Sequence, residues 1–386
     1  MQQTTPRIYL DHAATTPLDE SVFEKMKPYL LSSFGNADSP HSFGREAMSA
    51  VDLARDKLAQ LINAKPSEIY FTSGGTESDN WAVLGGVYAK QKEGRRHVLL
   101  SAIEHHAVLS AGERLQQQGF EVEYIPVNEG GRVELNDVKS RLRADTALIG
   151  VMAVNNETGV IQPFQEIARL AKQNGTLCFV DGVQAAPYMP IDVKAWGVDA
   201  LSFSSHKFYG PKGVGVLYVR NGVKIEKLVA GGEQERGMRG GTLNVAGVVG
   251  LSAAYEKAVK NMPQNNAKIT ALKERFLQLI GVLDGIKRNG EGESVSSVLN
   301  LQIEGVENVA LLYSMDLQGV AFAAGSACAS ASVKPSHVLT AMGLSEGQAK
   351  NSVRLSFGKE NTMEEIEVSA KLFVETVKNL RKNAKK

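Results

Sequence analysis

Cysteine is scarce in this sequence. The 386 residues include only Cys178 and Cys328, which lie far apart in the chain. Two such thiols are too few for a framework of disulfide bonds or for a four-cysteine metal site, and no metal site is expected. A large net charge is also absent, because 43 basic and 42 acidic residues leave a net charge of +1. This balance excludes a global field that would capture nucleic acid or anionic lipid.

Long apolar runs are missing too. No segment approaches the roughly 18 apolar residues that a membrane-spanning helix needs. The first twenty residues show neither a secretory signal nor a transit-peptide pattern. With 43% hydrophobic and 22% charged residues, the composition predicts a globular protein of two or three domains. We expect it in the reducing cytoplasm, in contact with neither membrane nor nucleic acid.

Short apolar segments alternate with helical patterns along most of the chain. We expect strands at residues 98–101, 122–127, 147–154, 177–181, 200–203 and 215–219. Such alternation predicts a mostly parallel sheet covered by helices. After about residue 260, longer helices predominate, with a strand at 298–303 and a last helix whose capping box starts at Thr362. The domain boundary is therefore expected near residue 260.

Lys207 lies between a short apolar strand and a glycine-rich turn, among Phe203, Phe208 and Tyr209. This position is expected to desolvate the amine partly, which lowers the pKa of a lysine and makes it a nucleophile toward an aldehyde. The natural aldehyde for such a lysine is pyridoxal phosphate (PLP). The alternative is a surface lysine beside a turn, with its charge in water.

Asp181 ends the buried-strand pattern at residues 177–181. Open α/β sheets bind ligands at the carboxyl ends of their strands. A carboxylate there can keep a pyridine nitrogen protonated, so that the ring acts as an electron sink. The alternative is that Asp181 only caps a helix.

A glycine pair and a threonine connect a predicted strand to a predicted helix within residues 68–80. Gly75 and Thr76 would lie at the helix start, where free N–H groups and the positive end of the helix dipole favour a phosphate. The segment matches neither the dinucleotide-binding nor the P-loop pattern. The alternative is an ordinary turn that Thr76 caps.

Three further residues have a possible chemical role and an ordinary alternative. His105 could stack on a cofactor ring or transfer a proton, or it could only form a hydrogen bond in its loop. Cys328, in a loop of small residues, could be a sulfur nucleophile or a small apolar side chain. Arg354 could bind a carboxylate or be a structural arginine on an edge strand. Cys178, inside an apolar strand, is expected in the core.

Together these segments resemble the cysteine desulfurases of the NifS and IscS kind, in the class V aminotransferase group of PLP enzymes. The resemblance covers nearly the whole chain. It rests on motifs that occur in order: Leu-Asp-His-Ala-Ala-Thr-Thr-Pro, Thr-Ser-Gly-Gly-Thr-Glu-Ser-Asp-Asn, Ile-Glu-His-His-Ala-Val, Val-Asn-Asn-Glu-Thr-Gly, Asp-x-x-Gln, Ser-x-His-Lys, Glu-Arg-Gly-Met-Arg-Gly-Gly-Thr and Gly-Ser-Ala-Cys.

The resemblance implies an α/β fold, fold type I of the PLP-dependent transferases. A large domain, residues 16–259, would contain a mostly parallel seven-stranded sheet. A smaller α+β domain, residues 1–15 and 260–386, would carry the cysteine loop.

The resemblance also implies roles for individual residues. Those expected to bind the cofactor are Lys207 as the Schiff-base lysine, Asp181 at the pyridine nitrogen, Gln184 and Asn156 near the phenolic oxygen, His105 against the ring, and Gly75, Thr76, Ser204 and His206 around the phosphate. Thr242 would reach the phosphate of the neighbouring subunit in a homodimer. Arg354, with Asn156, would bind the substrate carboxylate. Lys207, His105 and Cys328 would be catalytic, and Cys328 would receive the sulfur.

The implied reaction converts L-cysteine to L-alanine and leaves a persulfide on Cys328. The sulfur would pass to an acceptor protein, an iron–sulfur scaffold or a tRNA-thiolation enzyme. Gly182 stands where alanine is common in the family, which is expected to loosen the packing under the ring, and the chain ends at Lys386 without a long extension. The alternatives are a selenocysteine lyase, an aminotransferase, a kynureninase-like hydrolase, and a catalytically silent sulfur-carrier or assembly protein.

Overall fold

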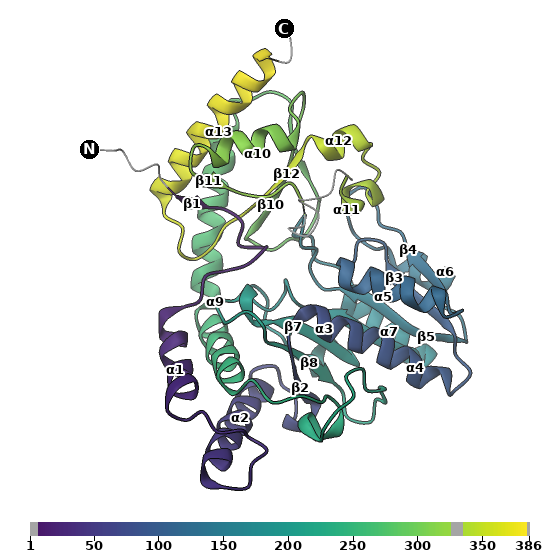
Figure 1. Cartoon of the computed structure of the whole chain (residues 1–386). Helices are drawn as coiled ribbons and strands as arrows, with labels where there is room; N and C mark the ends of the chain where they lie inside the picture. Colours follow the sequence, from purple (N-terminus) through teal and green to yellow (C-terminus); the bar gives the residue numbers. More distant parts are fainter. Residues whose placement is uncertain (1–6, 326–334, 384–386) are drawn as a thin grey trace.

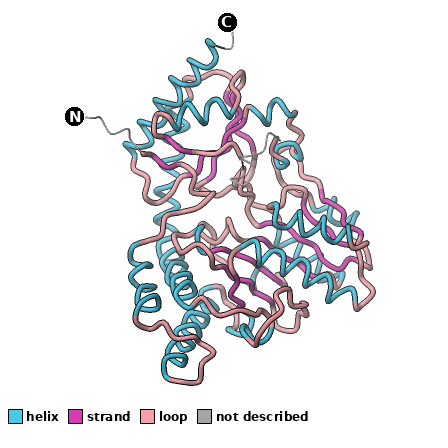
Figure 2. The backbone as a smooth tube through the Cα atoms, in the orientation of Figure 1, coloured by secondary structure: helices cyan, strands magenta, loops and turns pink. Residues whose placement is uncertain are grey.

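The structure is a computed structural model that describes residues 7–325 and 335–383. Cys328 lies outside these ranges. The strands form two groups, which Figure 2 shows in the lower and the upper half of the molecule. Within the described ranges, no helix combines the length and the apolar character that crossing a bilayer requires.

The larger group is a seven-stranded sheet with the order β2-β8-β7-β6-β5-β3-β4. Its strands are β2 (Ile69–Thr72), β3 (His97–Ser101), β4 (Glu121–Ile125), β5 (Thr146–Met152), β6 (Leu177–Asp181), β7 (Ala200–Ser204) and β8 (Gly215–Val219). β8 runs antiparallel to both of its neighbours, and the other neighbouring pairs are parallel. The predicted mostly parallel seven-stranded sheet is confirmed.

Alternate residues of the central strands face two separate cores, as the two-residue period of a strand requires. Leu148 and Phe179 belong to one core, whereas Ile149 and Val180 belong to the other. The first core also receives residues from η2 (Trp81–Gly85), α4 (Gly86–Gln91) and α5 (His106–Gln117), and the second from α6 (Leu135–Arg141), α7 (Phe164–Asn174) and α8 (Val193–Trp196). Helices therefore cover both faces of the sheet, and Cys178 is buried in the second core as expected.

The smaller group consists of an antiparallel sheet, β12-β10-β9, and a parallel pair, β1-β11. Its elements are β1 (Ile8–Tyr9), β9 (Ile286–Asn289), β10 (Val298–Ile303), α10 (Asn308–Asp316), β11 (Val320–Ala321), α11 (His337–Ala341), α12 (Glu346–Lys350), β12 (Ser352–Ser356) and α13 (Met363–Asn383). Ile8 and Leu10, near the start of the chain, share a third core with β10, β12 and α13. The first and the last described segments therefore share one part of the molecule.

The start of α13 confirms the predicted capping box. The Glu365 N–H donates to Thr362 Oγ1, and the Thr362 N–H donates to Glu365 Oε2, each over 3.1 Å. The helix buries one stripe of residues, which includes Ile366, Phe373 and Val377. The capping box thus fixes where α13 begins, and the buried stripe of α13 packs in the third core.

One long helix, α9 (Val245–Ile280), runs between the two parts of the molecule (Figure 1). Leu251 and Tyr255 belong to the core under the large sheet, whereas Ile269 and Phe276 belong to the third core. Two N-terminal helices, α1 (Glu20–Leu31) and α2 (Ser42–Leu61), pack against α9. The boundary expected near residue 260 falls within α9 and remains a proposal.

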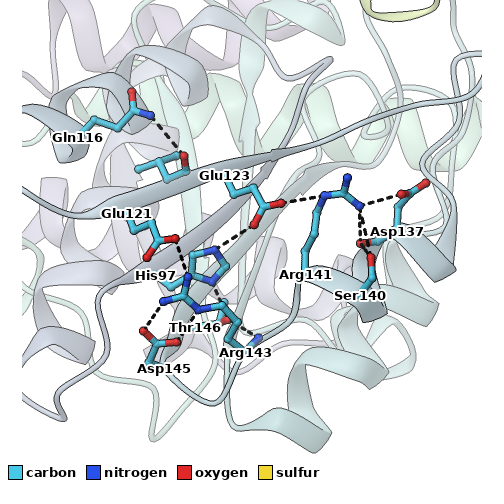
Figure 3. A network of polar contacts seen from close by, with 11 residues as sticks. His97, Gln116, Glu121, Glu123, Asp137, Ser140, Arg141, Arg143, Asp145 and Thr146 are labelled. Carbon is cyan, nitrogen blue, oxygen red and sulfur yellow. Dashed lines mark hydrogen bonds and ion pairs between the residues drawn. The ribbon is translucent and has the colours of Figure 1, made fainter.

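Charged side chains surround the amino ends of β3, β4 and β5 (Figure 3). His97, the first residue of β3, is buried, and its Nδ1 lies 2.9 Å from Thr146 Oγ1. Glu123 on β4 forms an ion pair of 2.9 Å with Arg141. This network lies at the edge of the sheet opposite to the carboxyl ends of the strands.

Candidate active site

A cavity of about 200 Å³ lies at the carboxyl ends of the parallel strands. β5, β6 and β7 end at Met152, Asp181 and Ser204, which all border it. Open α/β sheets bind ligands at this edge. The cavity brings together these residues expected from the sequence: Gly75, Thr76, His105, Asn156, Asp181, Gln184, Ser204, His206, Lys207 and Arg354.

Lys207 follows β7 in the short 3-10 turn η3 (Ser205–Lys207). Its Nζ donates to the backbone carbonyls of Ala13 and Ala14, over 2.6 and 2.9 Å. The side chain is half-buried at the cavity. This placement differs from that of a surface lysine beside a turn.

Asp181 is a buried carboxyl group at the end of β6, with 5% of its surface exposed. Its Oδ1 accepts a hydrogen bond of 2.9 Å from the Val183 N–H. Burial raises the pKa of Asp181, while this N–H and the charge of Lys207 act in the opposite direction. A second carboxyl group, Asp79, accepts from Ser202 Oγ, and burial together with Asp181 raises the pKa of Asp79. Two buried acids therefore stand beside the cavity.

His105 is the residue that precedes α5. Its Nδ1 accepts from the Ala107 N–H over 3.2 Å, which caps the helix. Burial, and then the nearby charge of Lys207, lower the pKa of His105 to about 4. The ring is therefore neutral near pH 7 and carries its proton on Nε2, because Nδ1 is an acceptor. The His105 side chain therefore caps α5 and also lines the cavity.

The turn before α3 (Gly75–Asn80) has the features of an anion cradle. Gly74 has φ of +152°, a backbone conformation that favours glycine. A Cβ on Gly75 would lie 3.0 Å from Val183 Cγ2, so the backbone borders the cavity closely. Since α3 continues through η2 into α4, its free N–H groups belong to a long helical segment.

The acid next to this cradle is already neutralised. Glu77 accepts two hydrogen bonds from Arg239, over 2.8 and 2.9 Å, and a third from the Ser73 N–H. Arg239 belongs to the charged, glycine-rich loop of residues 231–244, which includes η4 (Gln234–Gly237). The loop is therefore tied directly to the start of α3.

Arg354, on β12, reaches the cavity from the smaller part of the molecule. Only 1% of its surface is exposed. Its Nη2 donates to Asp11 Oδ1 over 2.7 Å, and its Nη1 donates to the backbone carbonyl of Asn156 over 3.1 Å. The guanidinium is thus a buried, oriented fork at the cavity wall.

Residues 11–16 form a loop that touches several cavity residues, although no site role was predicted for any of them from the sequence. Besides the contacts to Lys207 and Arg354, the Ala13 carbonyl accepts from Gln184 Nε2 over 2.9 Å. Thr15 Oγ1 lies 3.0 Å from His206 Nδ1. The sequence marked this loop by the motif Leu-Asp-His-Ala-Ala-Thr-Thr-Pro, directly after a short strand, but the motif alone did not show which residues it contacts.

Glu104 is a further buried acid that sequence reasoning missed. Its Oε1 accepts from the Met152 N–H over 2.7 Å and from Ser101 Oγ over 2.5 Å. Burial, and in addition the charge of Asp181, raise the pKa of Glu104 to about 8. The sequence does show that Glu104 lies between a strand end and two histidines, but it does not show that Glu104 is buried.

The looser packing expected at Gly182 is not found. A Cβ at this position would lie 2.7 Å from Leu201 Cδ1 and 3.0 Å from the Ser202 carbonyl oxygen. The Leu201 side chain and the neighbouring backbone thus fill the space that alanine would need.

Two residues expected to act at a site, Thr242 and Cys328, are not among the described residues that line this cavity. Thr242 is exposed on the loop before α9 and does not border the cavity. Cys328 lies outside the described residues, so its position relative to the cavity stays a prediction. Described residues near both ends of its segment approach Glu157: Ser336 Oγ donates to Glu157 Oε2 over 2.5 Å, and Gly325 lies close to the same carboxylate.

The fold and the cavity define an α/β protein whose ligand site combines a lysine amine, buried carboxyl groups and a glycine-lined helix start. The family model described as "Aminotransferase class-V" matches residues 8–368, and the chain belongs to this family.

A curated relative, "Cysteine desulfurase IscS" of Clostridium botulinum, is 43% identical over 97% of this chain and 95% of its own length. Among solved structures, a "NifS-like protein" aligns with a TM-score of 0.91 and 36% identity over 97% of this chain and all of that one. "SspA in complex with cysteine" aligns with a TM-score of 0.82 and 35% identity over 92% of this chain and all of that one.

Proposed function

We propose that the cavity binds PLP through Lys207 and that the protein is a PLP-dependent cysteine desulfurase. The observation that carries this proposal is that a single cavity joins the Lys207 amine, the buried Asp181 carboxyl group and the cradle at Gly75. These groups fit the three parts of PLP: an aldehyde, a pyridine nitrogen and a phosphate. The relatives' names, with cysteine as the ligand of one solved structure, support the choice of substrate.

In this proposal each side chain has one task. PLP, when bound, supplies an electron sink for the substrate's α-carbon. Asp181, whose pKa is raised by burial, can share a proton with a ring nitrogen. Lys207 Nζ takes up the α-proton, and Arg354 holds the substrate carboxylate through its fork. His105 stays neutral and offers Nε2–H as a donor beside the ring.

Cys328 is the proposed acceptor of the substrate sulfur. This role rests on the family resemblance, because the residue lies outside the described ranges. Thiolate, rather than thiol, is the sulfur nucleophile, so this step needs Cys328 deprotonated.

The test measures L-alanine formed from L-cysteine by protein supplied with PLP and a thiol reductant. We expect Lys207→Ala and Cys328→Ser each to lower turnover by at least about 10²-fold, the usual effect of removing an acid–base or nucleophilic group. Cys328→Ser should still bind PLP. Lys212→Ala, which removes an exposed lysine of the same turn, is the matched control. Unchanged turnover in Cys328→Ser would refute the persulfide step, and failure of the wild type to take up PLP would refute the whole proposal.

We also propose a homodimer in which Thr242 reaches the phosphate site of the second copy. Its exposure outside the cavity of its own chain supports this role. A set of exposed apolar side chains on α1, on α2 and on the segment between them supports a protein interface there: Phe23, Leu30, Leu31, Phe34, Phe43 and Leu53. We call this set the α1–α2 apolar surface.

The proposed destination of the sulfur is an acceptor protein in the cytoplasm, either an iron–sulfur scaffold or a tRNA-thiolation enzyme. Loading the enzyme with ³⁵S-cysteine and offering each kind of acceptor separately tests this choice. The true acceptor should remove the label from Cys328 without added reductant.

A further inference from the structure

The guanidinium of Arg354 is only partly used by its protein partners. An arginine side chain has five N–H donors. Asp11 accepts from Nη2 and the Asn156 carbonyl accepts from Nη1, whereas Nε is buried and has no hydrogen-bond partner among residues 7–325 and 335–383. Arg354 therefore keeps donors for a further acceptor while one carboxylate is already bound.

Asp11 sits where it can both orient and neutralise this guanidinium. It follows β1, and its backbone forms a bridge with Ser356, two residues beyond Arg354 in β12. A nearly fully buried arginine without a counter-charge would be strongly unfavourable, so Asp11 makes the site stable before a ligand arrives. Its 2.7 Å contact occupies one Nη2 donor and leaves Nε available.

The same carboxylate opposes the binding of a second one. A ligand carboxylate on Arg354 would lie close to Asp11, and two like charges that share one guanidinium repel each other. The proposed substrate and the proposed product both carry a carboxylate. The Asp11 carboxylate at the cavity wall therefore weakens the binding of the product as well as that of the substrate.

We propose that Asp11 is a positioning and specificity-determining residue of the carboxylate site: it holds the Arg354 fork in place and limits the affinity for α-amino acids, so that L-alanine can leave. This inference rests on the proposed function, because it takes the ligand to be an α-amino acid.

The experiment compares two variants of the full-length, PLP-loaded protein, Asp11→Asn and Asp52→Asn, in which a neutral asparagine replaces a charged aspartate. Asp11→Asn keeps an oxygen that can accept from Nη2 but removes the charge. We expect it to lower the dissociation constant of L-alanine, measured by calorimetric titration, by about three- to tenfold, because a like charge near the ligand is lost. The dissociation constant of L-alaninamide, which lacks the carboxylate, should not change. Asp52→Asn, at an exposed position of α2, controls for the change in net charge and should alter neither value.

A double-mutant comparison tests whether the effect passes through Arg354. In an Arg354→Gln background, Asp11→Asn should no longer tighten L-alanine binding. An unchanged L-alanine constant in Asp11→Asn, or an equal change for L-alaninamide, would overturn the inference. If Asp11→Asn does not fold, Asp11→Ser replaces it with the same expected direction.

The outcome is separate from that of the proposed function. A wild type that forms no L-alanine from L-cysteine refutes the desulfurase proposal. A wild type that does form it, together with an Asp11→Asn variant that binds L-alanine no more tightly, refutes only the role of Asp11.

Discussion

At the scale of single residues, the protein concentrates buried acids beside the cavity. Asp79, Glu104 and Asp181 are each at most 5% exposed, and burial raises the pKa of all three. Burial therefore makes the neutral form of each carboxyl group more favourable than it is in water. A cationic ring nitrogen nearby would favour ionisation of such a group, which links the burial of these acids to the proposed cofactor.

Glu104 gives a stability prediction for the protein prepared without PLP. Its pKa is raised to about 8 in the folded protein from an ordinary value of 4.5, so the folded state holds a proton that the unfolded state has lost. The stabilisation is complete below about pH 4.5 and is lost as the pH rises toward 8, at about 1.4 kcal/mol per pH unit. In urea unfolding between pH 5 and 8, the free energy of unfolding should therefore decrease less with rising pH in Glu104→Gln than in the wild type.

Gln is a suitable replacement because its Oε1 can still accept from Met152 and Ser101. Equal slopes in the two proteins would contradict the raised pKa of Glu104. A variant destabilised by the same amount at every pH would mean that Glu104 matters only through its hydrogen bonds.

Gly182 gives a packing prediction. An alanine at this position would place a Cβ 2.7 Å from Leu201 Cδ1, so Leu201 must move. Overpacking of this kind typically costs about 1–3 kcal/mol, and we expect Gly182→Ala to lower the free energy of unfolding by that amount. Gly347→Ala, on α12, is the control, since a Cβ there meets no atom within 4 Å. Equal stability of both variants with the wild type would show that Leu201 adjusts without cost.

Site residues could be predicted from the sequence where the residues next to them in the chain form a recognisable pattern. Lys207 and Asp181 each follow an apolar strand, and parallel strands place such positions at one edge. Asp11 and Asp79 also lie in recognisable motifs, but no role was predicted for them, because their partners Arg354 and Ser202 are far away in sequence. Their roles depend on tertiary contacts that no local pattern encodes.

At the scale of elements, the predicted strands agree with the observed ones best at β6 and β8. β6 and β8 have the predicted bounds, 177–181 and 215–219. β4 and β5 end two residues earlier than predicted. The apolar residues Val127 and Val154 leave the sheet there and pair locally, with Val133 and Ile161. Apolar character alone therefore could not locate the ends of these strands.

The amino ends of the strands yield a prediction about acid stability. His97 is buried, and burial together with the charge of Arg143 lowers the pKa of His97 (Figure 3). The unfolded chain therefore binds a proton that the folded protein resists. Stability should be complete above about pH 6.5 and fall at lower pH, by at most about 1.4 kcal/mol per pH unit for this one group.

His97→Gln tests this, because glutamine does not titrate and can still bond to Thr146 Oγ1. The variant should lose less stability than the wild type between pH 7 and 5 in denaturant unfolding. An identical acid dependence would show that His97 accepts the proton without cost, with Glu123 as its partner at 3.5 Å.

At the scale of the whole molecule, α9 joins two cores through one continuous helix. Its first half packs under the large sheet and its second half packs in the third core. The site uses both parts, because Lys207 and Asp181 come from the large sheet and Arg354 comes from β12. The sequence indicated a change of pattern near residue 260, but it could not show that one helix continues through it. A continuous helix fixes the distance between the two halves of the cavity wall.

The α1–α2 apolar surface and the exposed Leu317 beside α10 make different predictions about assembly. The α1–α2 apolar surface includes Leu31 and Phe34, which are 70% and 68% exposed. We expect the double variant Leu31→Asp/Phe34→Asp to weaken dimerisation by at least about 100-fold, because two charges would be buried in an apolar contact. Light scattering after size exclusion should show a monomer at low micromolar concentration. PLP affinity should fall too, since Thr242 of the second copy would be lost.

Leu317, 83% exposed at the end of α10, is the matched control because it is equally apolar and lies in the smaller part of the molecule. Leu317→Asp should leave the dimer intact. Dissociation by Leu317→Asp, with an unaffected double variant, would move the interface to α10. The proposed contact of Thr242 with a second phosphate site would then be refuted as well, because its loop is tied through Arg239 to α3, beside the large sheet.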